Sequence, residues 1–155
     1  MERFACYDTA LGLLEVGDTG GAVTHLRWVD GLTRSHDPTV LTNEAASQVR
    51  QYLAGERREF ELPLAPAGTD FQKAVWQALC AIPCGETRTY GEIACAIGRP
   101  AAARAVGAAA GRNPIWLVIP CHRCVGRGGA LTGYAGGLWR KEKLLALEKS
   151  LLTER

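Results

Sequence analysis

Short apolar runs alternate with turn residues over the first third of the chain. Residues 11–16 and 22–28 contain most of the leucine, valine and tryptophan of this region, and a stretch rich in glycine, 17–21, separates them. Apolar runs bounded by turn residues predict two β-strands. Residues 43–55 follow a helical period instead, with apolar positions at Ala46, Val49, Tyr52 and Leu53. A further strand is expected over residues 60–64.

A linker containing proline and glycine is expected over residues 62–68, and beyond it the apolar period is helical. Thr69 or Asp70 is suited to cap a helix that residues 82–85 end. A second short helix is expected over residues 90–97, closed by Gly98. Pro100, suited to a first helical position, begins a third over residues 101–110. Two short helices joined by a turn that contains glycine are compatible with a helix-turn-helix.

Together these elements predict an α+β fold in two domains. Residues 1–65 form a supporting module of strands and one helix, in which no polar side chains gather into an obvious site. Residues 69–152 form a mostly helical domain, and the residues suited to chemistry lie there.

The third expected helix has almost no polar side chains to offer. Residues 101–110 are mainly alanine, and Arg104 is the one long side chain among them. A usual recognition helix presents several polar groups to base edges in the major groove. Small residues instead allow a close approach to another surface. That surface is either a protein core or a DNA minor groove, with Arg104 inserted into the base stack as a wedge.

The run that ends at Cys121 is the first candidate for catalysis. Residues 115–119 are apolar, which predicts a buried strand that delivers Cys121 to an interior position. Burial raises the pKa of a thiol and makes it inert unless another group helps. His122 and Arg123 follow directly, but neighbours on an extended chain point to opposite faces. A turn or a bridging water is therefore needed. The alternative is an ordinary core cysteine.

The last expected helix, residues 137–152, carries a carboxylate within its apolar stripe. At about 100° per residue, Leu144, Leu145, Leu151 and Leu152 all lie within about 60° of Glu148. An unpaired buried carboxylate is costly, and Lys141, two turns away, is too distant for an i,i+4 pair. Glu148 therefore needs another partner, for which His122 is the natural candidate. The alternative is a frayed helix end where Glu148 reaches solvent.

Charge is distributed unevenly along the 155 residues. The net charge of +2 says little, but the chain from Phe71 onward holds 12 Lys or Arg against 5 Asp or Glu, and Met1 to Asp70 holds 6 against 11. A basic C-terminal part is typical of a surface that faces a polyanion, although surface charges also segregate by chance.

The N-terminus lacks the basic start and apolar run of a signal peptide, and no apolar stretch is long enough to span a bilayer. A cytoplasmic location is expected, where cysteines are more often buried thiols, ligands or nucleophiles than disulfides. Cys121 and Cys124 have a CxxC spacing, but a zinc site needs a second pair. Cys80 and Cys84 are too loosely spaced for one, with Cys80 expected to face its helix's core. A thioredoxin-like dithiol is disfavoured because a glycine-rich stretch follows rather than a helix.

Several motifs, taken together, resemble the O6-alkylguanine-DNA alkyltransferase family. They are residues 120–123 (Pro-Cys-His-Arg), 131–138, 85–94 and 103–107. The resemblance is close over residues 69–148 and general over the first 65. It implies a ribonuclease-H-like layout for the N-terminal domain and a winged helix-turn-helix in the C-terminal one. It also implies a monomer that needs no cofactor and acts on double-stranded DNA bearing O6-alkylguanine, through the minor groove.

The resemblance also implies roles for individual residues. Cys121 is the acceptor, His122 acts on it through a water, Glu148 orients His122 and Asn113 supports the bend around the site. Further implied site residues lie around these four. Tyr90 rotates the nucleotide outward and helps expel guanine, and Lys141 lies near the pocket. Arg104 fills the vacated place in the base stack, with Ala103, Gly107 and Arg123 as other DNA contacts. Cys124, Tyr134 and Ala135 contact the flipped base, and Trp116 forms a pocket wall.

Three departures from the family pattern bear on these roles. Cys124 replaces the usual valine, and oxidation would allow it to form a disulfide with Cys121. Trp116 is large where some relatives have a small residue, which leads to the hypothesis that methyl is preferred to benzyl-sized adducts. Cys6 has no companion ligands, so no zinc site is carried over.

Two other functions compete with alkyl transfer. One is an alkyltransferase-like lesion binder without chemistry, but such proteins lack the acceptor cysteine that Cys121 supplies. The other is a helix-turn-helix regulator, which leaves the placement of Glu148 and Cys121 without explanation.

Overall fold

The computed structural model describes residues 1–32 and 34–152. The chain divides into two compact units, Met1–Ala67 together with Pro114–Trp116, and Gly68–Asn113 together with the chain from Leu117 onward. The sequence predicts a single division of the chain at the linker, and it gives no indication that Pro114–Trp116 belong to the first unit. This tripeptide joins the first unit because Leu26 N donates to Pro114 O at 2.9 Å and Trp116 N donates to Leu26 O at 2.8 Å.

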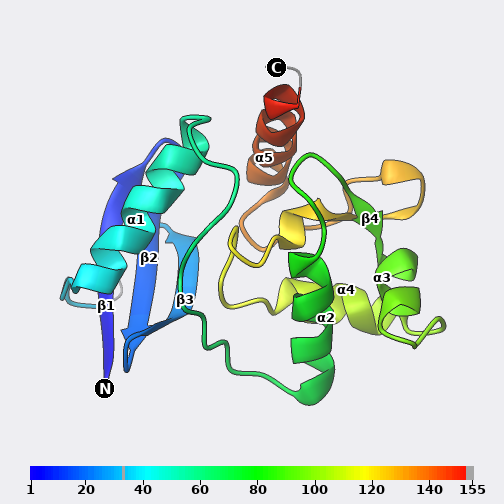
Figure 1. Ribbon diagram of the computed structural model, residues 1–155, viewed down its shortest axis with the longest axis horizontal. Coiled ribbons are helices and arrows are strands. Elements are labelled where there is room, and N and C mark those ends of the chain that lie inside the picture. The colour runs from blue at the N-terminus through cyan, green and yellow to red at the C-terminus, as the bar shows by residue number, and fades with distance from the viewer. Residues whose placement is uncertain (33, 153–155) are drawn as a thin grey trace. The chain divides into compact units, whose positions relative to one another are not determined.

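The first unit is a three-stranded antiparallel sheet with one helix across a face (Figure 1). The strands are β1 (Glu2–Thr9), β2 (Gly12–Thr19) and β3 (Ala22–Val29), in that order, and the helix is α1 (Val40–Leu53). Strands β2 and β3 correspond to the two that the apolar runs predict. The core of this unit includes Leu14, Val16, Leu26, Val49 and Tyr52, all fully buried.

Strand β1 is absent from the sequence-based expectation. Its buried residues Phe4 and Ala5 are neighbours rather than alternating positions, and the charged residues Glu2 and Arg3 precede them. The strand forms because it pairs with β2 along its whole length, from Glu2 opposite Thr19 to Thr9 opposite Gly12. Such non-local pairing decides strand formation more than the residues' own preference does.

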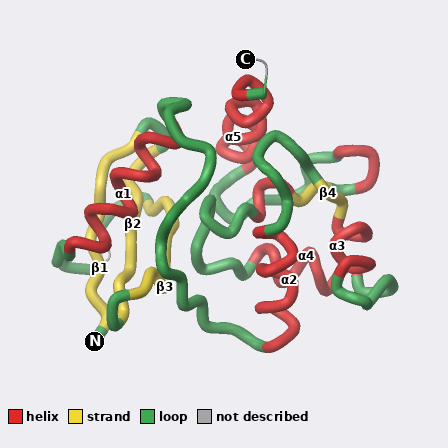
Figure 2. Tube along the Cα trace, viewed as in Figure 1, coloured by secondary structure: helices red, strands yellow, loops and turns green. Residues whose placement is uncertain are grey.

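The prediction of a strand over residues 60–64 is wrong. Figure 2 shows the connection between α1 and the next helix as loop, and within it only Leu64 bridges to Val23. Pro63 has no N–H to donate to a ladder. The segment is held by two bonds around that proline, from Val23 N to Pro63 O at 2.8 Å and from Ala65 N to Val23 O at 2.9 Å.

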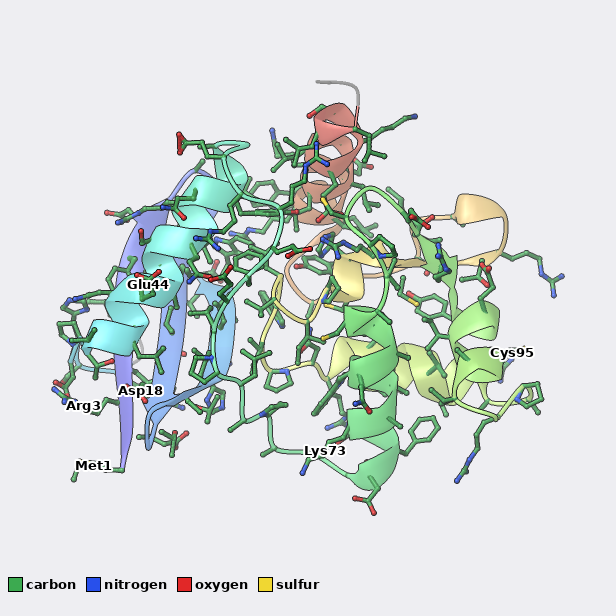
Figure 3. The ribbon with its side chains drawn as sticks, viewed as in Figure 1. Met1, Arg3, Asp18, Glu44, Lys73 and Cys95 are labelled. Atoms are coloured by element: carbon green, nitrogen blue, oxygen red, sulfur yellow. The ribbon has the colours of Figure 1, made fainter. Side chains whose placement is uncertain are left out.

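Helix α1 begins at Val40, three residues before the expected start, because Thr39 caps it. The Thr39 side chain accepts from Thr42 N, and the Thr42 side chain accepts from Thr39 N, which makes a capping box. Thr39 also donates to Asp18 at 2.8 Å, and Asp18 is labelled in Figure 3. The cap therefore ties the start of the helix to the end of β2.

The second unit begins with three helices, α2 to α4. Helix α2 (Asp70–Cys80) begins after Thr69 in a second capping box, as the sequence predicts. Its buried face carries Val75, Trp76 and Leu79, and Trp76 Nε1 donates to Ala109 O at 2.9 Å inside the unit. Cys80, expected to face the core, is exposed. The buried indole hydrogen bond therefore links α2 to the helix that carries Ala109.

Helices α3 (Tyr90–Ala96) and α4 (Ala103–Gly111) form the expected helix pair (Figure 1). Helix α4 begins at Ala103 rather than Ala101, so Pro100 is not its first residue. The reason is a turn in which Ala102 N donates to Arg99 O at 2.9 Å. Pro100 occupies the second position of that turn, where its fixed φ is favoured.

Residues 115–119 do not form the expected buried strand. Ile115 makes one bridge to Leu26 in the first unit. Leu117 then adopts φ +73, the left-handed conformation that a branched side chain rarely takes. The chain turns there, and Cys121 opens a short 3-10 helix, η1 (Cys121–Arg123).

Three short elements and a long helix complete the second unit. Strands β4 (Arg88–Thr89) and β5 (Cys124–Val125) pair in parallel, and η2 (Arg127–Gly129) follows them. The last helix, α5 (Leu138–Leu151), matches the predicted range 137–152 closely. Among the described residues no helix combines the length and apolar character needed to cross a membrane.

Candidate active site

Cys121 lies at a bend that Asn113 supports. The Asn113 side-chain amide donates to Ile119 O at 2.8 Å, and Cys121 N donates to the same carbonyl at 2.8 Å. Asn113 is 3 % exposed and Cys121 is 7 % exposed, so the bend is inside the unit. The amide of Asn113 thus fixes the backbone immediately before the thiol.

The Cys121 thiol is neutral at ordinary pH. Burial raises its pKa from 9.0 to about 11, although a hydrogen bond from Asn113 and the charge of Lys141 both oppose this rise. A thiol with this pKa is a poor nucleophile by itself. A nearby base is therefore required to make it react at neutral pH.

His122 and Glu148 are in direct contact, as the position of Glu148 in the helix stripe predicts. His122 Nε2 lies 2.7 Å from Glu148 Oε2, and both side chains are fully buried. Arg123 completes the cluster. Its Nε donates to Glu148 Oε1 at 2.8 Å, its Nη2 donates to Oε2 at 2.9 Å, and its Nη1 donates to Ile82 O at 2.7 Å. The frayed-end alternative for Glu148 is thereby excluded.

The charges in this cluster determine which nitrogen of His122 carries hydrogen. Burial would raise the pKa of Glu148, but the hydrogen bonds and charges of His122 and Arg123 hold the pKa well below its usual value. Burial is the largest influence on the pKa of His122 and lowers it. Glu148 raises this pKa, but the charges of Arg123 and Lys141 lower it further, so that it stays below its usual value. A neutral His122 that donates from Nε2 leaves Nδ1 as an acceptor. Nδ1 is buried and has no partner among the described residues.

Cys121 and His122 lie in one turn of η1 and not at the end of an extended strand. Neighbouring side chains in such a turn do not point to opposite faces as they do on an extended chain. The turn that was expected as one way to bring His122 to the thiol is therefore present. A water between the thiol and His122 Nδ1 stays a prediction.

A cavity of about 460 Å³ opens at Cys121. This volume is in the usual range for a small-molecule site. Besides Cys121, six of the predicted site residues line it, namely Tyr90, Ala103, Arg104, Gly107, Tyr134 and Ala135. The structure thus brings the expected DNA contacts on α4 and the expected pocket residues to the same space.

Tyr90 is placed by elements from both sides of the cavity. It is the first residue of α3, which Thr89 caps in a capping box with Glu92. The parallel pair β4–β5 sets Thr89 opposite Val125, directly after the reactive turn. The Tyr90 ring lies beside Gly107, since a Cβ added to this glycine would be 3.8 Å from the ring, at ordinary van der Waals distance. The phenol is therefore held between α4 and the segment that follows Cys121.

Lys141 is fully buried and binds the chain around the pocket. Its Nζ donates to Cys124 O at 2.7 Å and to Gly133 O at 3.0 Å. It does not pair with Glu148, as the helix spacing predicts. The ammonium instead clamps the loop that carries the pocket residues and brings a positive charge near Cys121.

Arg123 was expected among the DNA contacts, but the structure directs its side chain into the unit. The side chain is 7 % exposed and its three donor nitrogens are all bound inside the unit. Its role is to balance Glu148. Arg104, by contrast, is exposed on α4 at the cavity.

Two predicted pocket residues do not line the cavity. Trp116 belongs to the first unit, where its ring lies 6.3 Å from that of Trp28. Cys124 is buried, and its carbonyl already accepts from Lys141. A carbonyl has two lone pairs, so one remains for a base.

Thr132, which is not among the residues expected from the sequence, lines the cavity and donates to Tyr90 Oη at 3.2 Å. The one feature of the sequence that points to Thr132 is that it lies in the stretch 131–138, one of the motifs that carry the family resemblance. The pairing of Arg123 with Glu148 was also missed. A buried carboxylate beside a neutral imidazole requires a cation, and Arg123, next to His122, is the nearest in sequence.

The six cysteines are free thiols. Within the described part of the chain, no group of three or more His, Cys, Asp or Glu side chains is arranged to hold a metal ion.

Two family models cover nearly the whole chain. The model of the 6-O-methylguanine DNA methyltransferase DNA-binding domain matches residues 70–150. The model of the ribonuclease-like domain of the same methyltransferase matches residues 3–66.

Two relatives with similar sequences carry the same name. A methylated-DNA–protein-cysteine methyltransferase of Mycobacterium tuberculosis is 48 % identical over 156 residues, which cover 97 % of this chain and 94 % of the relative. The Methanosarcina barkeri protein of the same name is 48 % identical over 151 residues, covering 94 % and 96 %. The crystal structure of Mycobacterium tuberculosis OGT in complex with DNA aligns with a TM-score of 0.89 at 49 % identity, covering 96 % and 94 %.

Replacing Glu148 by glutamine is expected to lower the free energy of unfolding by about 3–5 kcal/mol, because Arg123 is left as an uncompensated buried charge. Urea unfolding at neutral pH measures this. Glu142→Gln, at an exposed position of the same helix, is the matched control and is expected to change stability by less than about 0.5 kcal/mol. Equal stability of the two variants would contradict the role given to Glu148.

The contribution of Glu148 to stability is expected to depend on pH. Its folded pKa lies below the unfolded value of 4.5, so the contribution is fully present above that value and is lost as pH falls through the folded pKa. The difference in unfolding free energy between the wild type and Glu148→Gln therefore shrinks on acidification from about pH 6 to pH 3. A difference that stays constant over this range would mean that the carboxylate is not specially stabilised.

Proposed function

Because the chain belongs to the 6-O-methylguanine DNA methyltransferase family, we propose that Cys121 accepts the alkyl group. The protein binds DNA and repairs it by direct reversal, moving an alkyl group from O6 of guanine to a cysteine of its own chain. The observation that carries the assignment is the position of the thiol. Of the cysteines in residues 1–32 and 34–152, Cys121 is the one that lines the cavity.

His122 activates the thiol, and Glu148 positions His122. Glu148 holds the Nε2–H of the imidazole, so Nδ1 is free to take the thiol proton through a water. This is a nucleophile with a base and an orienting carboxylate. Cys121 itself stays protonated at rest because its pKa is about 11, and the thiolate forms only as the proton moves.

The guanine enters the cavity by leaving the duplex. An alkyl carbon on O6 is not accessible in line with a thiol while the base is stacked, so the nucleotide rotates outward. Helix α4 approaches the minor groove with its small side chains, and exposed Arg104 fills the vacated place in the stack. The basic character of the chain from Phe71 onward supports binding to the phosphate backbone.

Attack on the alkyl carbon forms a C–S bond and breaks the C–O6 bond. The electron pair of the broken bond stays on guanine. The thiol proton passes to His122 and is released from there to water, while guanine takes up one proton, so that the net change is the exchange of the alkyl group for the thiol proton. Tyr90 assists departure of the base from the cavity wall. The thioether left on Cys121 has no ready leaving route, so each molecule acts once and needs no cofactor.

We infer that the protein works as a cytoplasmic monomer. None of its six cysteines forms a disulfide, and an acceptor thiol must remain reduced, as a reducing compartment ensures. The preference for methyl over larger adducts, which the bulk of Trp116 suggests, stays a prediction.

Intact-mass spectrometry tests the acceptor. Incubation with a duplex that contains O6-methylguanine is expected to add one methyl group to the wild type, at a yield that never exceeds one per molecule, and none to Cys121→Ser. Peptide mapping is expected to place the methyl on residue 121.

The same measurement separates the competing functions. A wild type that binds the lesion but gains no mass would be a lesion binder or regulator without chemistry. A methyl group that persists in Cys121→Ser would move the acceptor to another cysteine, with Cys124 as the first candidate.

A further inference from the structure

The hydroxyl group of Thr132 is bonded to the phenol of Tyr90 at the cavity. Thr132 Oγ1 donates to Tyr90 Oη at 3.2 Å, and both residues line the space that Cys121 opens onto. Thr132 comes from the loop that follows η2, and Tyr90 comes from the start of α3. This bond joins the two segments at the cavity itself, next to the reacting groups.

The rotamer of Thr132 is fixed by packing on Gly126. A Cβ added at Gly126 would lie 2.8 Å from Thr132 Cγ2, so the methyl group rests directly against the glycine backbone. Gly126 N donates to Ala130 O at 2.8 Å, which closes the intervening loop. With the methyl held on this side, the hydroxyl of Thr132 points at Tyr90.

This arrangement determines where the phenol hydrogen of Tyr90 is free to point. A phenol oxygen donates one hydrogen and also accepts. Because Thr132 acts as the donor in their bond, the hydrogen of Tyr90 is not used there. The Tyr90 ring rests beside Gly107 of α4, so the hydroxyl group is held while its hydrogen remains available to a base in the cavity.

We propose that Thr132 is a positioning residue for alkyl transfer, which aims the Tyr90 hydroxyl hydrogen at the departing guanine by donating to Tyr90 Oη. The proposal rests on the proposed function. As Cys121 takes the alkyl carbon and the C–O6 electron pair passes to guanine, the hydrogen bond from Tyr90 stabilises the developing negative charge. Thr132 contacts the phenol and not the reacting atoms.

The electrostatics of Tyr90 agree with this geometry. Burial raises the pKa of the phenol, and the hydrogen bond from Thr132 opposes that rise. Thr132 therefore makes Tyr90 a stronger hydrogen-bond donor than burial alone would leave it. Such preorganised donors are effective because they are aimed before charge develops.

The test compares Thr132→Val, which keeps the shape and removes the donor, with Thr132→Ser, which keeps the donor. In single-turnover methyl transfer from O6-methylguanine duplex, Thr132→Val is expected to be slower by about tenfold, and Thr132→Ser to stay within about threefold of the wild type. Thr87→Val, at an exposed position that does not bind Tyr90, is the matched control and is expected to react at the wild-type rate.

A double-mutant cycle distinguishes positioning from a general structural effect. In a Tyr90→Phe background, adding Thr132→Val is expected to cause no further loss, because there is no hydroxyl to aim. The alkaline decline of the wild-type rate, where Tyr90 ionises, is expected to move to higher pH in Thr132→Val.

Three results would overturn the proposal. They are a wild-type rate for Thr132→Val, an equal loss in the Tyr90→Phe background, and an unchanged pH profile for a slowed Thr132→Val. Failure of the proposed function is separate, since it would appear as no methyl gain on the wild type.

Discussion

The buried carboxylate of Glu148 holds the reactive turn in place. It accepts from His122 Nε2 at 2.7 Å and from two nitrogens of Arg123 at 2.8 and 2.9 Å. These contacts join the end of α5 to His122 and Arg123, two of the three residues of η1. Because each charged group is balanced, the cluster tolerates burial that would otherwise be costly. It also sets the tautomer of His122, and so determines which nitrogen is available to a proton from Cys121.

The cavity depends on this anchor and on two further buried attachments. Lys141, from the same helix α5, clamps the carbonyls of Cys124 and Gly133. Trp76 fixes α4 through Ala109 O. One helix therefore supports the loop side of the cavity and another supports the side that carries Arg104. The small residues of α4 lie on both of its faces: Ala109 and Ala110 are buried in the unit, whereas Ala105 and Ala108 are exposed. Contact of the exposed face with DNA is part of the proposed function.

Periodic segments with local capping were predictable from the sequence, and segments fixed by distant contacts were not. Helices α2 and α5 were predicted with nearly correct ends because Thr69 is a strong cap and the leucine stripe is regular. Strand β1 needs its pairing with β2, and the left-handed Leu117 leaves no signal in the residue types. At the site, the place of Glu148 in the stripe predicted its contact with His122. The burial of Arg123 and the hydroxyl contact of Thr132 depend on side-chain directions that spacing does not give.

The protonation of His122 is the most direct test of whether this ring is the base that activates Cys121, because Glu148 and Arg123 act on the thiol through the ring. Nitrogen NMR of the imidazole in the free protein reports which nitrogen carries hydrogen. We expect a neutral ring at pH 7 with hydrogen on Nε2 and a bare Nδ1. In Glu148→Gln that preference is expected to weaken. A ring with hydrogen on Nδ1, or an imidazolium at pH 7, would contradict the assignment of His122 as the base that activates Cys121.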